Sequence, residues 1–468
     1  MLLMTHFRIP ASPHSRIPTM RTLTSSLVIV TLLASTASAQ QSRPPLRRLG
    51  AAVATSDALG AVAAIQALPG GKLLVNDPSR RQLLLLDSTM KVIAVVADTT
   101  PATKAAYGTR TGGLLPFRGD SALFVDPNSL SMLVIDPAGK VARIMAAPRA
   151  NDVIFLLGGP QGNPGFDAKG RLVYRAQSFG PPRGGMAGQP MQPPVIPDSV
   201  PLVRYDLFAR KLDTAAFVRS PAPKFNVVQN ERGVSMTTII NPLQEVDDWA
   251  VLPDGTIAIV RKDYHVDYVD ANGQKTSSPK IPFDWQRLSD SAKTAIIDSA
   301  KARMARARAG GPGGGFVITR EGPGGNDVVA GGGGPGAGPG GGAPVMVFRT
   351  ERAEGGPPPR GGAPAGTTLP ATPPALTFVE PSELPDYQPA FTTGSVRADR
   401  EGKLWVRIFT PLQSNAGPEY DVIDRTGKLV DRVALPSGTT IAGFGPNGTV
   451  YLGVRDASGT HITRAHER

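Results

Sequence analysis

The densest cluster of ionisable residues lies in the stretch DYHVDY, from Asp263 to Tyr268. Side chains alternate between the two faces of a β-strand, so Asp263, His265 and Asp267 are expected on one face. An imidazole between two carboxylates can bind a metal ion or act as a general base. The same pattern is typical of the solvated face of a strand whose tyrosines pack in a core. We favour this second interpretation and keep the three polar residues as weak candidates for a metal site.

The signatures of common hydrolases are missing from the sequence. It has no HExxH motif, no GxSxG motif and no Cys, so the usual zinc-protease and serine- or cysteine-nucleophile patterns are absent. We therefore name no catalytic residue and expect no cofactor. A chain without Cys also has no thiol for a lipid anchor and no disulfides.

The first 39 residues have the pattern of a secretory signal peptide. Three Arg residues precede a short apolar run, LVIVTLLA, and the small residues Ala37-Ser38-Ala39 follow it. The run is shorter than the roughly 20 residues that span a bilayer, so no stable membrane anchor is expected. We predict cleavage between Ala39 and Gln40 and a periplasmic or secreted protein.

Six similar units occur along the rest of the chain. Each has an apolar run, a turn containing Gly, and a second run rich in β-branched or aromatic residues, which is a strong hairpin signal. In five units a third strand follows and ends at an Asp whose carboxylate can accept backbone N–H groups in the next turn. Four antiparallel strands per unit indicate the blades of a β-propeller. The six stretches are LPGGKLLVND, LPFRGDSALFVD, FDAKGRLVYRA, VLPDGTIAIVR, VRADREGKLWVRI and GFGPNGTVYLGV.

The predicted fold is thus an all-β, six-bladed propeller, with seven blades as the alternative. The last unit lacks an outer strand, which residues 48–57 near the mature N-terminus can supply, closing the ring. Residues 224–243 are strand-like and fit blade three, blade four or a unit of their own. The predicted boundaries are 1–39 for the signal peptide, 40–284 for blades one to four, 285–309 for an inserted helix, 310–377 for a disordered Gly/Pro-rich insert and 378–468 for blades five and six.

The insert begins with a predicted amphipathic helix. Ser289 is a suitable N-cap, and an apolar stripe is expected at Leu288, Ala292, Ile296, Ala300 and Met304. Beyond it, residues 310–366 are mostly Gly, Pro and Ala, a composition typical of disorder. The islands GFVITR and PVMVFRTER within this tract are candidates for added strands or for scattered apolar residues in a linker.

Equivalent positions at the ends of the second strands are expected around one rim of the propeller. Acidic residues in the first two blades would face basic residues in the other four, and Arg side chains could bind an anionic ligand there. Ion pairing between blades is the competing interpretation. These rim candidates are Asn76, Asp77, Asp126, Arg175, Arg261, Arg407 and Arg455.

The stretch LPDG…IAIVRKDYHVDYVDANG and the hairpin units resemble the six-bladed propellers of the NHL and TolB-like superfamily. The resemblance covers residues 47–284 and 378–468 and implies a fold rather than a function. Some six-bladed propellers are lactonase-like, metal-dependent hydrolases with carboxylate and Asn ligands on inner strands. The inner strands here are apolar, and only Glu245, Asp247 and Asp248 come close.

We therefore expect an exported, non-catalytic propeller that acts as a binding or protein-interaction scaffold, with the metal-dependent hydrolase as the alternative. The formal net charge of +12 is compatible with a protein partner or an anionic surface ligand. For an exported chain we expect no nucleic acid partner, and we expect a monomer.

Overall fold

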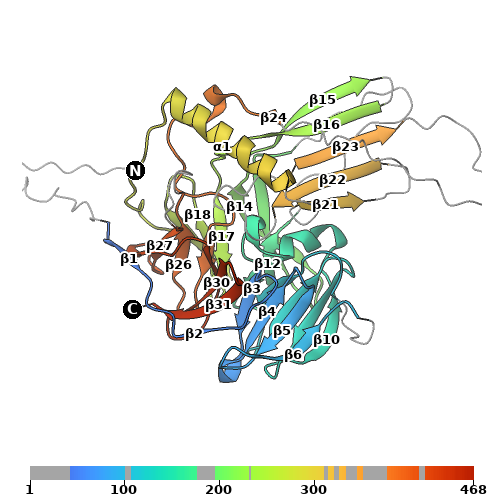
Figure 1. Ribbon diagram of the computed structural model, residues 1–468, viewed down its shortest axis with the longest axis vertical. Coiled ribbons are helices and arrows are strands. Elements are labelled where there is room, and N and C mark those ends of the chain that lie inside the picture. The colour runs from blue at the N-terminus through green and yellow to red at the C-terminus, as the bar shows by residue number, and fades with distance from the viewer. Residues whose placement is uncertain are drawn as a thin grey trace, which may run out of the picture. The chain divides into compact units, whose positions relative to one another are not determined.

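The computed structural model describes residues 43–100, 107–176, 196–230, 233–309, 315–320, 326–333, 345–351, 377–409 and 417–467 (Figure 1). The predicted signal peptide, its cleavage site at Ala39 and Gln40, and the Pro/Gly-rich stretch 177–195 lie outside these residues. Within them, no helix combines the length and the apolarity needed to cross a membrane.

Four of the predicted units form sheets of four consecutive antiparallel strands. The apolar runs become the strands, and the Gly-containing turns join them. Blade 1 contains β3 (Ala64–Ala67), β4 (Leu73–Asp77), β5 (Gln82–Leu86) and β6 (Val92–Ala97). Blade 2 contains β7 (Gly113–Pro116), β8 (Ala122–Asp126), β9 (Ser131–Ile135) and β10 (Val141–Ala146). Blade 3 contains β11 (Gly165–Phe166), β12 (Leu172–Arg175), β13 (Ser199–Tyr205) and β14 (Leu212–Arg219). Blade 4 contains β17 (Asp248–Val251), β18 (Ile257–Val260), β19 (Val266–Val269) and β20 (Lys275–Ser277).

The last two blades take a strand each from the N-terminal end of the described chain. Blade 5 contains β25 (Val396–Ala398), β26 (Leu404–Arg407), β27 (Glu419–Ile423) and β28 (Leu429–Ala434), and β1 (Leu46–Arg48) is added parallel to β28. Blade 6 contains β29 (Thr439–Phe444), β30 (Thr449–Asp456) and β31 (Gly459–His466), and β2 (Ala54–Thr55) completes it antiparallel to β31. The predicted closure by residues 48–57 is therefore confirmed, and β1 covers the outer edge of blade 5 as well.

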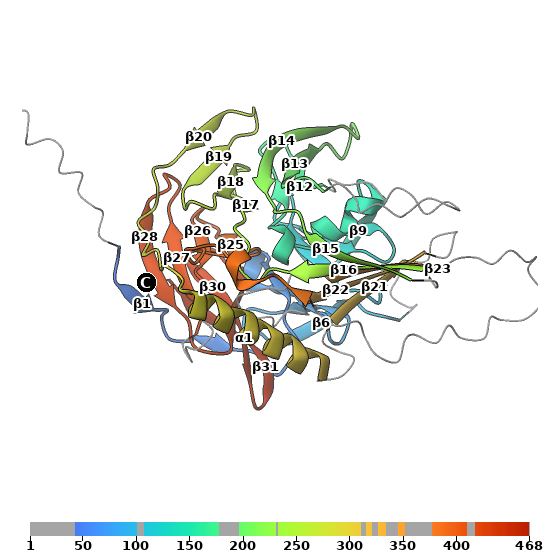
Figure 2. The ribbon, with the colours of Figure 1, turned by 90° about the horizontal axis from the view of Figure 1, so that it is seen from above.

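The sheets form a closed ring, because the apolar core is divided among neighbouring blades. One cluster joins Leu74 of blade 1 to Phe124 of blade 2, and others join each later blade to the next. The cluster that contains Val75 and Tyr451 joins blade 1 to blade 6. The inner strands also contact one another in chain order, and β29 of blade 6 contacts β3. Figure 2 shows blades 4 and 5 with their strands in sequence from the inner to the outer one. The all-β propeller prediction is confirmed.

The turns explain why the repeat carries Asp and Gly at fixed places. Asp87 accepts hydrogen bonds from the backbone N–H groups of Thr89 and Lys91, at 2.8 and 3.1 Å. The corresponding residues Asp136, Asp206, Asp270 and Asp424 accept backbone N–H groups in the same way. Gly255 has a φ of 85°, and a Cβ atom there would lie 2.1 Å from the backbone nitrogen of Ala168 in blade 3. Only Gly fits this contact between two blades.

Residues 224–240 form a unit of their own. They give β15 (Lys224–Asn230) and β16 (Gly233–Ile240), which belong to a separate sheet with β21 (Gly315–Arg320), β22 (Asn326–Gly333) and β23 (Val345–Glu351). The short β24 (Thr377–Phe378) pairs with β16 in parallel. The prediction of a disordered insert is wrong for the two apolar islands, because both supply strands to this sheet. The predicted boundary at residue 284 also assigned β15 and β16 to the blades, to which they do not belong.

Helix α1 (Asp290–Ala309) begins where it was predicted, and the hydroxyl of Ser289 accepts the N–H of Ala292 at 3.2 Å. The predicted apolar stripe is confirmed in part, since Ala300 is buried and Leu288 and Ile296 pack against the core, and the buried face also includes Lys293 and Ile297. Ile297 packs with Leu243, Val379, Leu384 and Phe409, and a 3-10 turn, η4 (Pro381–Glu383), lies against the helix. The amine of Lys293 reaches Asp386 at 2.9 Å, so a Lys can occupy the buried face.

Candidate functional site

The three candidate metal ligands lie together but bind one another and their neighbours. His265 Nδ1 lies 2.7 Å from Asp263 Oδ1, and its Nε2 lies 3.3 Å from Asp267 Oδ1. Asp263 also pairs with Lys280 at 3.2 Å, and Asp267 accepts Arg261 Nε at 2.7 Å. Within the described residues, no group of three or more His, Cys, Asp or Glu side chains could hold a metal ion.

The prediction that residues 263–268 form one strand is wrong. Tyr264 lies in a tight turn with a φ of 62°, and β19 begins only at Val266. The turn places Tyr264 in the core between blades 4 and 5, where its side chain is fully buried. The polar residues around it are therefore brought together by the turn and not by strand alternation.

The rim candidates of the first two blades are buried and support the backbone. Asn76 donates to the carbonyl of Gly112 at 2.7 Å and accepts the hydroxyl of Tyr107 at 2.7 Å, joining blades 1 and 2. Asp77 accepts the N–H groups of Gly60 and Ala61, at 2.8 and 2.9 Å. Asp126 plays a similar part in the next blade, where it accepts the N–H groups of Asn128 and Ser129.

The basic rim candidates separate into three groups. Arg261 is held by Asp247 and Asp267, each at 2.7 Å, and these ion pairs lie within blade 4 and not between blades. Arg455 is exposed at the end of the last blade. Arg175 and Arg407 are mostly enclosed, and the Nε atom of each is buried without a hydrogen-bond partner among the described residues. The structure thus does not join the seven candidates into one site, and it singles out these two.

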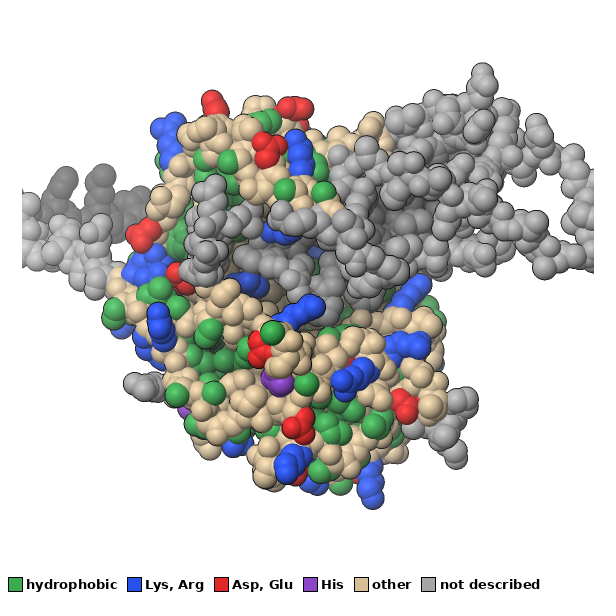
Figure 3. Space-filling model, viewed as in Figure 1, with side chains coloured by type: hydrophobic (Ala, Val, Ile, Leu, Met, Phe, Trp, Pro, Cys, Tyr) green, Lys and Arg blue, Asp and Glu red, His purple; other side chains and the backbone are tan. Residues whose placement is uncertain are grey.

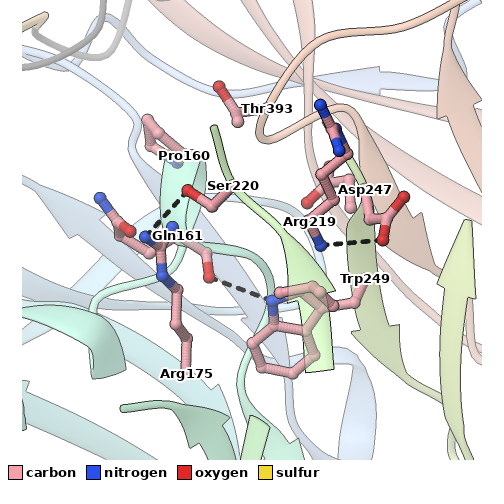
Figure 4. Close-up of a pocket in the computed structure, with 10 residues that line it drawn as sticks. Pro160, Gln161, Arg175, Arg219, Ser220, Asp247, Trp249 and Thr393 are labelled. Atoms are coloured by element: carbon pink, nitrogen blue, oxygen red, sulfur yellow. Dashed lines mark hydrogen bonds between the residues drawn. The ribbon is translucent and has the colours of Figure 1, made fainter. Parts of the chain in front are cut away.

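Arg175 lies in a pocket where blades 3, 4 and 5 meet (Figure 4). The unfilled space amounts to about 250 Å³ when the solvent at the opening is counted, and the walls themselves enclose room for about one water molecule. The pocket is lined by residues of blade 3, the start of β17 and the loop before β25. These are Pro160, Gln161, Arg175, Val218, Arg219, Ser220, Asp247, Asp248, Trp249 and Thr393.

Backbone contacts hold the walls of the pocket. Trp249 is buried, and its indole N–H donates to the carbonyl of Gln161 at 3.2 Å, as Figure 4 shows. Gln161 ends a short 3-10 turn, η3 (Gly159–Gln161), which is followed by Gly162. A Cβ atom on Gly162 would lie 2.1 Å from the indole nitrogen, so the ring can reach Gln161 only beside a Gly. The side-chain Oε1 of Gln161 is buried with no hydrogen-bond partner among the described residues.

Arg175 is the main cation of the pocket. Its Nη2 donates to the hydroxyl of Ser220 at 3.2 Å, and its guanidinium carbon lies 5.7 Å from the centre of the Phe155 ring. Burial lowers the pKa of Arg175 to about 10, and the charge of Asp248 opposes this shift. The guanidinium is therefore desolvated but still charged at neutral pH.

Asp248 is the buried carboxylate of the pocket and stands at the start of β17. Its Oδ2 accepts the N–H of Val396 in blade 5 at 2.9 Å, so it joins blades 4 and 5. Burial raises the pKa of Asp248 to about 7, although this and other backbone hydrogen bonds favour the charged form. The carboxyl group consequently changes its charge close to neutral pH.

Two further arginines belong to the first two strands of blade 5. Burial lowers the pKa of Arg397, the middle residue of the inner strand β25, and the charge of Arg407 lowers it further, whereas Tyr420 and Asp248 raise it. Arg407 ends the neighbouring strand β26. The charge of Asp248 thus acts on both Arg175 and Arg397, and the charge of Arg407 acts on Arg397.

The sequence pattern predicted Arg175 and Arg407 as site residues, and it drew attention to Asp247 and Asp248. It did not indicate Arg397, Gln161 or Ser220. A signal for Arg397 does exist, because it is a charged residue on an inner strand in a protein whose other inner strands are mostly apolar. Gln161 and Ser220 lie in irregular segments that carry no such pattern, and only the folded chain places them beside Arg175.

Comparisons with known proteins give propeller-type structures at low similarity. A member of the DUF4221 family from Bacteroides vulgatus has a TM-score of 0.40 at 8% identity, over 90% of this chain and 95% of that one. Regucalcin, a calcium-binding protein from Agrobacterium tumefaciens, has a TM-score of 0.37 at 11% identity, over 90% and 98%. Virginiamycin B lyase from Staphylococcus aureus has a TM-score of 0.33 at 9% identity, over 87% and 95%. No protein-family model and no curated protein matches the sequence.

Proposed function

We propose that this chain is an exported, non-catalytic β-propeller that binds a partner through the pocket between blades 3, 4 and 5. The observation that carries the proposal is Arg175, a desolvated guanidinium that lines the pocket and whose buried Nε has no hydrogen-bond partner in the described part of the chain. A buried donor without an acceptor costs about 1–3 kcal/mol, and a bound ligand can supply the missing acceptor.

The carboxylates of the pocket support a binding role. Asp247 accepts the N–H of Arg219 at 2.8 Å and pairs with Arg261, while Asp248 accepts the N–H of Val396. These groups hold three blades in register, so they act as parts of the scaffold. The side chains left to meet a ligand include the guanidinium donors of Arg175 and the acceptor Oε1 of Gln161.

The surface outside the pocket favours no single class of partner. Figure 3 shows Lys and Arg side chains scattered among Asp and Glu side chains over the described part of one face. Such a mixed surface is typical of a soluble scaffold and carries no broad field of one sign. The concentration of guanidinium groups around the pocket is therefore the feature that selects a ligand.

The test is to purify the mature chain, from Gln40 onward, out of its native compartment and to identify small molecules released on denaturation by mass spectrometry. Thr393→Trp should block the pocket and abolish retention of the ligand. Thr276→Trp places the same ring on the exposed outer strand of blade 4 and should leave retention unchanged.

If the protein only binds its ligand, the molecule that is added back to it should be recovered unchanged after denaturation. Equal retention by the two Trp variants would contradict the pocket as the binding site. Conversion of the added molecule, lost in Thr393→Trp, would contradict the non-catalytic role and favour the hydrolase alternative.

A further inference from the structure

We propose that three exposed side chains, Trp285, Arg287 and Tyr387, form a face that binds a proline-rich segment, and that residues 370–374 of this chain are its occupant. None of the three lines the pocket between blades 3, 4 and 5, so the proposal goes beyond the binding function proposed above. The two proposals can also fail separately, because retention of a ligand by the pocket does not depend on this face.

The exposure of the two aromatic rings is unusual in this chain. Trp285 is 41% exposed and Tyr387 is 50% exposed, whereas the other two Trp and seven Tyr side chains are 9% exposed or less. Arg287 is exposed as well. Trp, Tyr and Arg are the residue types that contribute most to binding energy at protein interfaces. A surface that exposes one of each at neighbouring positions is therefore a candidate for binding.

A short two-stranded ribbon brings these side chains to one face. Backbone hydrogen bonds of 2.8 and 2.9 Å join residues 286–288, which follow blade 4, to residues 386–388, which precede blade 5. A bridge in this ribbon pairs Arg287 with Tyr387. Trp285 lies two residues before Arg287, so the alternation of side chains along an extended segment places it on the same face.

Aromatic packing fixes Trp285 in place. Its ring lies edge-on to that of Phe283, with 5.1 Å between the ring centres. Phe283 in turn packs edge-on with the buried Tyr264 at 5.3 Å, and the guanidinium carbon of Arg43 lies 5.2 Å from its centre. A ring that is held before binding loses little conformational freedom on contact, so the exposed part of Trp285 is preorganised for a ligand.

The chemistry of the face fits a polyproline II segment. The face combines two apolar rings with the donor groups of an indole, a guanidinium and a phenol, so its ligand must offer apolar surface and free acceptors side by side. A polyproline II segment offers both, because its proline rings are apolar and its carbonyl groups make no hydrogen bonds within the segment. Aromatic-lined surfaces are a recurring mode of recognising such segments.

The chain carries a segment of this kind directly before β24. Residues 370–374 lie outside the described residues and have the sequence PATPP, a PxxP pattern typical of polyproline II ligands. The surrounding stretch, residues 361–376, contains no charged side chain. It therefore brings no cation that Arg287 would repel.

The segment is attached to the protein beside the face. It ends three residues before β24, and Phe378 of β24 packs against the same apolar cluster as Leu288 of the ribbon. Leu288 follows Trp285 by three residues, a span of at most about 10 Å. A short tether of this kind gives a millimolar effective concentration, which favours residues 370–374 over a segment of another molecule.

The experiment is quenching of tryptophan fluorescence by acrylamide in the mature protein, from Gln40 onward. Acrylamide reaches exposed rings, so the quenching reports on Trp285, and Trp285→Phe should remove the quenchable emission. Replacing Pro370, Pro373 and Pro374 by Ser should uncover the ring. Quenching of the wild type should be about half as steep as that of this proline variant, because a tethered segment occupies the face most of the time.

The chain offers a matched control. Residues 190–194 have the sequence PMQPP, with the same spacing of prolines, but they lead into β13 of blade 3. Replacing Pro190, Pro193 and Pro194 by Ser should leave the quenching of the wild type unchanged. Arg287→Gln should raise the quenching of the wild type toward that of the proline variant and should not change the proline variant itself.

Equal quenching of the wild type and the proline variant would overturn the assignment of residues 370–374. If added decaproline then protects Trp285, the face binds a proline-rich segment of another protein, and if it does not, the specificity for proline is overturned as well. Protection that appears only as the protein concentration rises would assign the face to the segment of a second copy. An increase of quenching in the control variant alone would assign it to residues 190–194.

Discussion

Tyr264 donates its hydroxyl to Oδ2 of Asp421 at 2.7 Å, across the interface between blades 4 and 5. Both side chains are buried, and Asp421 also contacts Arg432 Nε at 3.3 Å and Arg43 Nη2 at 3.5 Å. Burial raises the pKa of Asp421, and the hydrogen bond and the two cations oppose that shift. One carboxylate thus joins two blades to the N-terminal end of the described chain.

The first prediction concerns this pair. Tyr264→Phe keeps the ring but leaves a buried carboxylate oxygen without its donor, so the free energy of unfolding should fall by about 1–3 kcal/mol. Urea denaturation measures the change. Tyr268→Phe is the matched control, because that hydroxyl donates to the carbonyl of Asp424 at 3.1 Å in a partly buried place and should cost less. Equal effects in the two variants would contradict the role given to Asp421.

A second prediction concerns the N-terminal strands. A chain that starts at Leu49 lacks β1 and exposes the outer edge of blade 5, and one that starts at Ser56 also lacks β2, so blade 6 is one strand short. Calorimetry should show that the midpoint temperature of thermal unfolding is lowered by roughly a few degrees in the first chain and by clearly more in the second. A chain that starts at Arg43 is the control. Midpoints that do not differ among the three would mean that these strands do not hold the ring closed.

The third prediction tests Asn76 as a structural residue. Asn76→Ala removes both hydrogen bonds between blades 1 and 2, and each orphaned group, the Tyr107 hydroxyl and the Gly112 carbonyl, costs about 1–3 kcal/mol. Urea denaturation should show this loss while ligand retention by the folded protein is unchanged. Asn272→Ala, in an exposed turn of blade 4, should have almost no effect. If Asn76→Ala loses the ligand but keeps its stability, Asn76 is a ligand-binding residue and not a structural one.

The fourth prediction concerns pH. The pKa of Asp248 is about 7 in the folded chain, and an unfolded Asp has a pKa near its ordinary value of about 3.9. The folded state therefore holds the proton more tightly, and stability falls as pH rises between these two values, by about 1.4 kcal/mol per pH unit. When Asp248→Asn is denatured at several pH values between 5 and 7, its free energy of unfolding should not show this decrease.

Asp254→Asn is the control for the pH experiment, because Asp254 is partly exposed and pairs with Arg425 at 3.2 Å. The free energy of unfolding of Asp254→Asn should fall with rising pH as steeply as that of the wild type. If the free energy of unfolding of Asp248→Asn falls with pH as steeply as that of the wild type, the Asp248 carboxyl group does not titrate near neutral pH.

Local interactions explain which parts of the fold could be predicted. Asn447 and Gly448 both have positive φ, at 57° and 63°, which is the turn that an Asn-Gly pair between apolar runs predicts. Asp87 and its counterparts bind the N–H groups of their own turns. Both effects lie within a few residues of chain, so the sequence of each unit contains all that is needed.

Errors arose where a neighbouring element decided the outcome. The strand expected at residues 263–268 is interrupted because Tyr264 turns into the core between two blades. The predicted helix stripe included Ile296 and Ala300 but missed Ile297, which packs with Leu243 and Val379. Of the two apolar islands in the insert, β23 pairs with β16, and β21 joins the same sheet through β22.

The sequence by itself determined the repeat, the hairpins and the supply of a closing strand from residues 48–57, because alternation, turn residues and strand number are local properties. Only the tertiary structure decided which polar side chains have hydrogen-bonding groups without a partner among the described residues. Asn76, Asp77 and Asp126 resemble Arg175 and Arg407 in their place in the repeat, yet the former satisfy backbone groups of their own or the next blade. Arg175 of blade 3, Asp248 of blade 4 and Thr393 from the loop before β25 line one pocket because ring closure brings these blades together, and no spacing along the chain predicts that meeting.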